Sequence, residues 1–434
     1  MSNQVLNRID KDAYLVSLSQ QVSQVSSEDW LTHIRHRASA FLQEQTFPTN
    51  QDEEWRFTDL SPLSKVNFVN ANFPSSLPDI SSLIIPESAQ TRLVFVNGIY
   101  ADKLSDLSNI NSGVFVGNLA NLPEENHQKI TELLAQQPGG EEVFTALNTV
   151  GFTDVGIVWI PKNVQVENPL HLLFISVNNG NSSINQPRCL IIADQGSNVT
   201  IIEEFVSGNS TDIPSFTNSV TEIWLGENTT VNHTRIQREN QTAFHIGKTA
   251  IAQGRYSHYT GNAINLGASI SRHNLDLWQM GESTTTNLNG LTMIKNKQLA
   301  DTHSLISLKY PHGLSRQLYK YIIDDQAHGV FNGKVWVPKP AQLTDAGQLN
   351  RNLLLSSRAK IDTKPQLEIT ADNVKCSHGA TVSQLEDDEL FYLQSRGLDG
   401  DISRQLLINA FATEILQLIP IQSVQNTLSK LIKN

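Results

Sequence analysis

The stretch QGSNVTII, residues 195–202, is a glycine turn that leads into an alternating strand, and it recurs three times in similar form. Because units of this length cannot bury their own apolar faces, such a repeat is typical of stacked coils. It predicts a mainly β fold with a parallel β-helix core, and a large β-sandwich is the alternative. The other copies are LGENTTVN (225–232), QGRYSHYT (253–260) and MGESTTTN (280–287), and the glycines Gly196, Gly226, Gly254 and Gly281 lie 30, 28 and 27 residues apart.

The chain divides into three segments that differ in sequence pattern, and the repeat lies in the second of them. Residues 151–395 contain short runs rich in Val, Ile, Thr and Asn between single glycines, and they form the predicted β-helix core. Residues 1–150 combine helical apolar spacing with a short strand, which predicts a mixed, largely helical N-terminal cap. Residues 396–434 are predicted to form a helical C-terminal region that Pro420 divides into two helices.

The composition excludes several classes of protein. The chain has 434 residues, of which 39% are hydrophobic, and its formal charge is -11. The negative charge argues against a nucleic-acid partner, because such binding rests on Lys and Arg that neutralise phosphates. No apolar run approaches the roughly 20 residues that cross a bilayer, and the N-terminus shows no secretory or transit signal. We expect a cytoplasmic protein with neither a membrane nor a nucleic-acid partner.

Common catalytic motifs are absent as well. The sequence contains no phosphate-binding glycine loop, no GxSxG nucleophile elbow and no HExxH zinc motif. Adjacent acidic residues such as Asp324 and Asp325 are more typical of turns than of paired catalytic acids. The cysteines are Cys189 and Cys376, so the chain alone cannot provide the four thiolates of an ordinary iron–sulfur or zinc site. We expect a non-enzymatic chain that binds no cofactor stably by itself.

Cys376 and His378 are the strongest candidates for a functional site. If residues 374–379 are extended, the two side chains share one face of a strand, with Cα atoms about 6 to 7 Å apart. An adjacent imidazolium favours the thiolate, and thiolate with imidazole can ligate iron or zinc, which makes this a tentative metal-binding pair. The alternative is that Cys376 is a small buried hydrophobic residue. Cys189, inside the apolar run RCLIIA, is predicted to belong to the core.

An apolar stripe marks the first C-terminal helix. Leu407, Phe411, Ile415 and Leu418 follow one another at spacings of four, four and three residues. The stripe either packs on the chain's own β region or forms a docking surface for another subunit.

Three further stretches are spread over nearly the whole chain. They are EEWRFTDLSPL (53–63), FNGKVWVPKPAQLTDAGQLNRNLLLS (331–356) and DNVKCSHGATVSQLEDDELFYLQSRGL (372–398). Together they resemble the SufB/SufD family of iron–sulfur cluster assembly proteins, and specifically its SufD branch. The resemblance implies a right-handed parallel β-helix flanked by helical N- and C-terminal regions.

The resemblance also implies partners and roles for a scaffold subunit. A SufD-like chain pairs with a SufB-like scaffold protein, and its C-terminal region holds a SufC-like ATPase, which gives a docking role to Leu407, Phe411 and Ile415. Cys376 and His378 would face the SufB-like partner, where iron or an iron–sulfur cluster is held transiently. In SufB-like members a cluster-building cysteine lies in the stretch that corresponds to residues 348–355. This chain has none there, which favours SufD.

Two other functions remain alternatives at the level of sequence. One is a carbohydrate-active β-helix enzyme, which the fold alone suggests. The other is a homo-oligomeric structural β-helix protein in which Cys376 is inert. A homodimer of a SufD-like chain is also compatible with the sequence.

Overall fold

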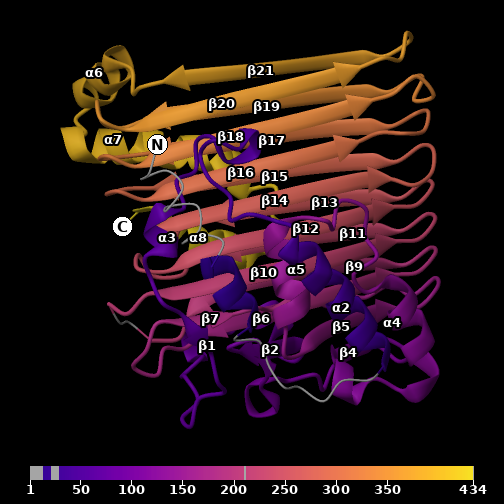
Figure 1. Ribbon diagram of the computed structural model, residues 1–434. Helices are drawn as coiled ribbons and strands as arrows, with labels where there is room; N and C mark the ends of the chain where they lie inside the picture. Colours follow the sequence, from indigo (N-terminus) through magenta and orange to yellow (C-terminus); the bar gives the residue numbers. More distant parts are fainter. Residues whose placement is uncertain (1–12, 21–28, 210–211, 434) are drawn as a thin grey trace, which may run out of the picture.

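The chain winds through eight coils, each of which contributes one strand to each of two facing sheets (Figure 1). This computed structural model describes residues 13–20, 29–209 and 212–433. The strands of successive coils pair in parallel, as in β12 with β14 and β13 with β15. The predicted parallel β-helix is therefore confirmed, and the β-sandwich alternative is wrong, because sandwich sheets are antiparallel.

The two sheets face each other along the whole β-helix. In spatial order the first sheet contains β4 (Phe115–Asn118), β5 (Val155–Ile160), β8 (Arg188–Ala193), β10 (Ser215–Leu225), β12 (Phe244–Gln253), β14 (Ile270–Gln279), β16 (Leu299–Ser307), β18 (His328–Val337) and β20 (Lys360–Ile369), with β1 (Val69–Asn70) and β7 (Ser183–Asn185) beside this path. The second contains β3 (Ile99–Tyr100), β2 (Arg92–Val96), β6 (Leu170–Ser176), β9 (Asn198–Ser207), β11 (Thr230–Gln237), β13 (His258–Asn265), β15 (Thr285–Ile294), β17 (Leu314–Ile323), β19 (Asp345–Leu354) and β21 (Lys375–Ser383).

The recurring glycines lie where the turns of successive coils come closest. A Cβ atom on Gly254 would lie 2.8 Å from the carbonyl oxygen of Leu225 and 2.9 Å from the carbonyl carbon of Gly226, in the turn of the preceding coil. Two residues later Tyr256 has a φ of 56°, and Asn228 has a φ of 55° at the equivalent place in the coil below. The repeat seen in the sequence is therefore the repeat of a tightly stacked turn.

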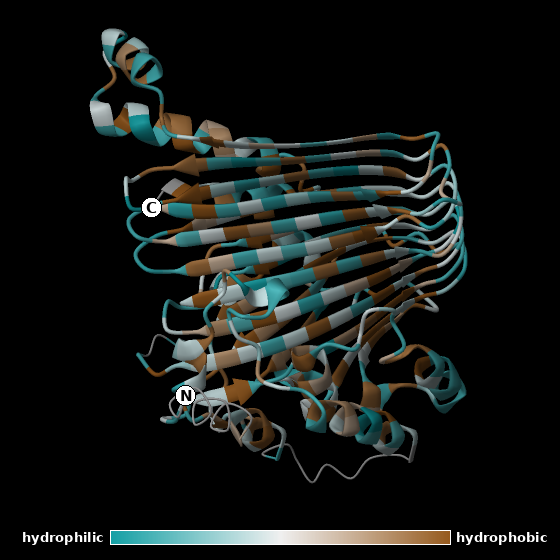
Figure 2. Ribbon diagram, turned by 45° about the horizontal axis from the view of Figure 1, so that its top comes forward, coloured by the Kyte–Doolittle hydropathy of each residue, from teal (hydrophilic) through white to brown (hydrophobic). Residues whose placement is uncertain are grey.

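The interior between the sheets is apolar in the first coils. Phe95, Phe174 and Phe205 stack on one another, with ring centroids 5.4 Å and 5.0 Å apart. Burial of each such side chain stabilises the fold by about 1.5–3 kcal/mol. Hydrophobic and hydrophilic residues alternate along the strands, because successive side chains point to opposite faces of a strand (Figure 2).

The N-terminal region covers the outer face of the first sheet. Its helices are α2 (Asp29–Gln43), α3 (Ser61–Ser64), α4 (His127–Leu133) and α5 (Val143–Gly151), and residues 13–20 are also helical. β2 and β4 come from the segment predicted as a mixed cap, and they extend the two sheets. Residues 1–12 and 21–28 of that segment lie outside the described residues.

A strap at residues 53–60 fastens this region to the first sheet. The guanidinium of Arg272 lies 3.8 Å from the ring centroid of Trp55, and its Nη1 donates to Asp301 at 2.7 Å. Burial acts to raise the pKa of Asp301, but the charges of His303 and Arg272 outweigh it and lower this pKa to about 2. The carboxylate therefore stays ionised, and the strap is bound by paired buried charges.

The C-terminal region contains α6 (Asp387–Ser395), α7 (Gly400–Leu416) and α8 (Gln422–Lys433). α7 and α8 pack on the outer face of the second sheet through apolar side chains of both helices and of successive strands. The ammonium group of Lys320 donates to the Phe411 carbonyl at 2.8 Å and pairs with Glu414, which anchors α7. None of the helices in the described part of the chain has the length and apolar character that a bilayer crossing requires.

The last coil, formed by β20 and β21, has no neighbour on one side within the described chain (Figure 1). Neither strand contains a buried residue, although β18 and β19 directly below contain several. Pro365 lies in β20, and proline is tolerated on edge strands because it lacks a donor N–H. This end of the β-helix therefore presents unpaired backbone groups and the open interior.

We predict that Gly254→Ala lowers the free energy of unfolding by about 1 to 3 kcal/mol, because the added methyl group forces the two turns apart. Chemical denaturation followed by circular dichroism measures this change. Gly347→Ala is the control, since a Cβ atom there meets nothing closer than 3.5 Å. Equal stability of the Gly254→Ala variant and the parent chain would contradict the proposed role of the turn.

Candidate functional site

Cys376 and His378 lie on β21, the strand of the last coil that belongs to the second sheet. Their register partners on β19 are Ala346 and Gln348, both of which are buried in the interior. Because paired residues of parallel strands point to the same face, Cys376 and His378 lie on the inner face of the β-helix. Cys376 packs half-buried against the interior core, whereas His378 is exposed at the open end.

The environment of Cys376 favours the protonated thiol. Burial raises the pKa of this thiol, the Asp345 carboxylate raises it further, and a hydrogen bond with the Ala346 backbone acts in the opposite direction. This upward shift of the Cys376 pKa is opposite to the downward shift that an adjacent imidazolium would cause. Burial is the main cause of this shift, and the Asp345 carboxylate on the neighbouring strand adds to it, so thiolate character at Cys376 stays a prediction.

The two side chains provide an incomplete ligand set. Within the described residues, no group of three or more His, Cys, Asp or Glu side chains is arranged to hold a metal ion. Iron in a cluster takes four ligands, commonly thiolates, and a thiol with an imidazole supplies at most two protein ligands. Any iron held at this end needs further donors from outside the described chain.

Other residues weighed in the sequence have structural roles. His245 Nδ1 lies 2.6 Å from Glu239, and His233 bonds to the Tyr259 hydroxyl at 3.0 Å, so both are hydrogen-bonded in the interior. Cys189 is 1% exposed, and burial raises its pKa well above the usual value, which confirms its assignment to the core. Asp324 and Asp325 lie in the turn after β17, where Asp325 has a φ of 53°.

The predicted docking stripe on α7 packs largely on the chain itself. Ile415 is completely buried in the apolar cluster beneath α7 and α8, so it is a packing residue rather than a docking residue. Leu407 and Phe411 are half-buried, and the ring of Phe411 lies 4.1 Å from the Lys320 ammonium. A docking role for these two stays a prediction.

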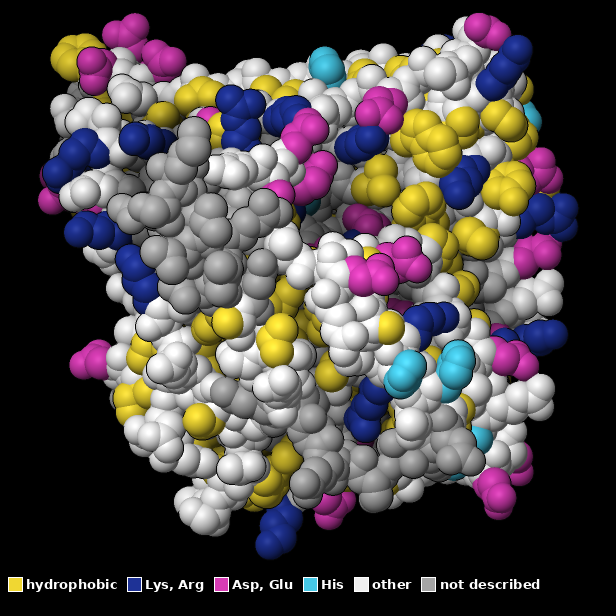
Figure 3. Space-filling view, viewed as in Figure 1, with side chains coloured by type: hydrophobic (Ala, Val, Ile, Leu, Met, Phe, Trp, Pro, Cys, Tyr) yellow, Lys and Arg dark blue, Asp and Glu magenta, His cyan; other side chains and the backbone are white. Residues whose placement is uncertain are grey.

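A second set of apolar residues around α6 and α7 is exposed. Phe391 and Tyr392 are 72% and 57% exposed, and Ile402 and Leu406 are 53% and 47% exposed. In Figure 3 a hydrophobic side chain at the upper left, where α6 lies in Figure 1, is surrounded by acidic ones. The i,i+4 spacing of Ile402 and Leu406 is the feature of the sequence that could have indicated a second apolar face on this helix. We call these four residues, with the acidic residues Asp387, Asp388, Glu389 and Asp401, the α6–α7 surface.

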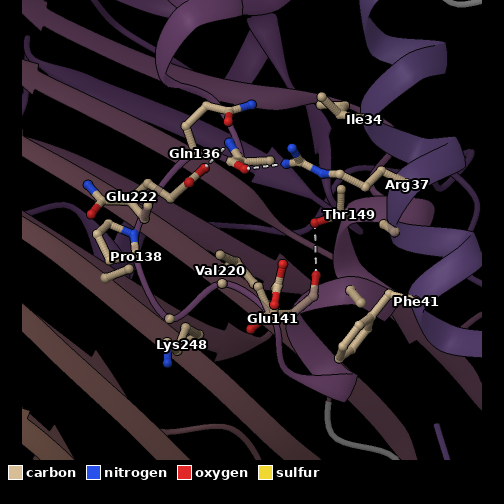
Figure 4. A pocket seen from close by; sticks show the side chains of 18 of the residues that line it. Ile34, Arg37, Phe41, Gln136, Pro138, Glu141, Thr149, Val220, Glu222 and Lys248 are labelled. Carbon is tan, nitrogen blue, oxygen red and sulfur yellow. Dashed lines mark hydrogen bonds between the residues drawn. The ribbon is translucent and has the colours of Figure 1, made fainter. Parts of the chain in front are cut away.

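A pocket of about 370 Å³ lies between α2, α5 and the outer face of the first sheet (Figure 4). Several of its charged groups have fixed partners. Arg188 bonds to Glu222 at 2.6 Å, Lys248 pairs with Asp276, and Arg37 donates to the Ala135 carbonyl at 3.0 Å. Arg188 also donates to Asn148 and Thr149 of α5, which links the N-terminal region to the first sheet. The pocket contains neither Cys376 nor His378.

Comparison with known proteins gives matches along most of the chain. Residues 174–411 match the family described as "SUF system FeS cluster assembly, SufBD core domain", and residues 11–172 match "SufBD protein N-terminal region". The chain belongs to the SufBD family. The family match covers the strap, all eight coils and most of α7, so Cys376 and His378 lie within its core domain.

Relatives from several organisms share most of the chain's length. An iron–sulfur cluster assembly SufBD family protein of Synechocystis is 46% identical over 98% of this chain and 96% of its own length. The iron–sulfur cluster assembly protein SufD of Escherichia coli is 32% identical, with 85% of each chain covered. A chloroplastic Arabidopsis thaliana protein named ABCI7 is 34% identical over 91% of this chain and 84% of its own.

We predict that iodoacetamide modifies Cys376 but not Cys189 in the native chain, because Cys189 is buried and Cys376 is only half-buried. The raised pKa of Cys376 makes the reaction slower than that of an unperturbed thiol at neutral pH. Mass spectrometry of the intact chain and of its peptides measures both effects. Cys376→Ser should abolish labelling of the native chain, and labelling of Cys189 before unfolding would contradict the structure.

Proposed function

We propose that the chain is a SufD-type scaffold subunit for iron–sulfur cluster assembly that pairs with a SufB-like protein through its last coil. The observation that carries this proposal is the unpaired end of the β-helix, with Cys376 and His378 on its inner face. An exposed strand edge recruits another strand, so a partner that adds strands to β20 and β21 satisfies their backbone groups and covers the interior. The Escherichia coli relative is itself named SufD.

Iron and sulfide are the substrates of the shared site in this proposal. His378 supplies an imidazole nitrogen to iron, and Cys376 supplies a sulfur ligand that releases its proton on binding. The remaining ligands come from the SufB-like partner. Residues 348–355, the stretch in which SufB-like chains are expected to carry a cluster-building cysteine, contain no thiol here. The absence supports a SufD rather than a SufB role.

The α6–α7 surface is the proposed docking site for a SufC-like ATPase. α6 contains no buried residue of its own, and the exposed ring of Phe391 is available to enter an apolar socket, whereas the ring of Tyr392 lies 5.3 Å from the Arg396 guanidinium. Acidic residues at the start of α6 surround them, so the complementary surface carries an apolar socket with a basic rim. Movement of the ATPase would reach β21 through the short link between β21 and α6.

We predict that His378→Ala lowers the rate of cluster formation about tenfold or more in the reconstituted complex with the SufB-like partner and the ATPase. Absorbance of the growing cluster follows the reaction. His258→Ala is the control, because His258 is an exposed histidine at a turn end of β13. An unchanged rate for His378→Ala would remove His378 from the proposed site.

We predict that Phe391→Ser weakens binding of the purified SufC-like ATPase by about 2 kcal/mol, because an exposed aromatic anchor contributes most where it becomes fully desolvated. Isothermal titration calorimetry with the full chain measures the affinity. Met280→Ser is the matched control, since Met280 is 49% exposed on a turn of the β-helix remote from α6. Equal affinities for both variants would show that the ATPase binds elsewhere.

A further inference from the structure

Gln348 lies directly beneath His378 in the stack of coils. The two residues are register partners on β19 and β21, and both side chains point to the inner face. Gln348 is 3% exposed, so its amide is enclosed by the interior although His378 itself is at the open end. A buried side-chain amide needs hydrogen-bond partners on both its oxygen and its nitrogen.

A chain of hydrogen bonds determines which end of the Gln348 amide is free. Its Nε2 donates to Gln317 Oε1 at 2.6 Å, and Gln317 Nε2 donates to Ser304 Oγ at 2.7 Å. Both amide nitrogens are thus directed into the coils below. Gln348 Oε1 is buried and has no hydrogen-bond partner among the described residues, which leaves an acceptor beneath His378.

The neighbouring polar groups do not offer the same acceptor. Asn350 Oδ1 already accepts from Thr363 at 2.8 Å and from Asn352 at 2.7 Å. Asn352 Oδ1 is also buried without a partner in the described part of the chain, but its register partner is Val382, which lies four residues beyond His378. Gln348 is therefore the open acceptor in register with the histidine.

A histidine that binds a metal through one ring nitrogen usually donates its other N–H to a fixed acceptor, which sets the tautomer and the ring orientation. We propose that Gln348 is a positioning residue for His378: its side-chain carbonyl accepts the hydrogen bond from the ring N–H that faces the interior. The other ring nitrogen then presents its lone pair to iron at the partner interface. This inference rests on the proposed function, in which His378 is a ligand of the iron substrate.

The test uses the full chain, paired with its SufB-like partner and labelled with ¹⁵N in the histidine rings. His378→Ala identifies the signals of His378. In the parent pair we expect one ring nitrogen of His378 to be protonated and the other unprotonated, as in a single tautomer. Gln348→Leu removes the acceptor and should give a mixture of tautomers, whereas Gln348→Glu retains an acceptor oxygen and should restore the single tautomer.

Gln253→Leu is the matched structural control. Gln253 is a fully buried interior glutamine in β12, and its amide is hydrogen-bonded to Ser257, Thr285 and Thr286. This substitution should destabilise the coils to a similar degree and leave the tautomer of His378 unchanged. A change in the tautomer with Gln253→Leu as large as with Gln348→Leu would overturn the inference, since the effect would then be general loosening.

A second readout is the affinity of the pair for Fe²⁺ alone, which should fall about 10- to 100-fold in Gln348→Leu and recover in Gln348→Glu. A single unaltered tautomer in Gln348→Leu overturns the inference. So does a ring nitrogen that faces Gln348 without a proton, because Gln348 would then be a donor. The proposed function fails separately, if His378→Ala leaves cluster formation unchanged whatever the tautomer is.

Discussion

Backbone pairing between successive coils is the constraint on which the rest of this molecule depends. The register continues without a shift from Thr230 to His258 and on to Thr285, one coil at a time. Since the N–H and C=O groups of a coil are satisfied by the coils above and below it, the final coil of such a stack keeps one unpaired side. Cys376 and His378 lie on that coil, so their availability follows from the same rule that builds the fold.

The two helical regions cover the faces of the sheets and leave the end of the stack open. On the first sheet Arg272 links Trp55 of the strap to Asp301, and on the second sheet Lys320 holds the carbonyl of Phe411. Each contact gives a buried cation a hydrogen-bond partner, and leaving that cation buried without one would destabilise the fold. The helical regions are thereby fixed to the sides of the β-helix, and a partner can approach the end without displacing either of them.

Features that depend on residues close together in the sequence could be predicted, and features that depend on other strands could not. The spacing of the turn glycines and the alternation around Cys376 depend on neighbours in the chain, so the coils and the shared face of Cys376 and His378 could be predicted. The pKa of Cys376 is raised mainly by burial in the stack of coils and further by Asp345, which belongs to another strand, and no pattern of neighbouring residues predicts either effect. Leu406 and Leu407 are adjacent, and only the position of α7 on the sheet decides which is more exposed.

The geometry of the open end also restricts how a partner can complete the site. Neighbouring strands lie about 4.8 Å apart, so a strand added to β21 brings its inward side chains to about that distance from Cys376 and His378. Ligands at about 2.0–2.3 Å from a common metal ion are separated by less than this, so small side-chain adjustments close the gap. A partner on the outer faces of the sheets could not reach these donors, because both point into the β-helix. In the proposed pairing, strand addition at the open end would bring the ligands of two chains together without rearranging the coils of this one.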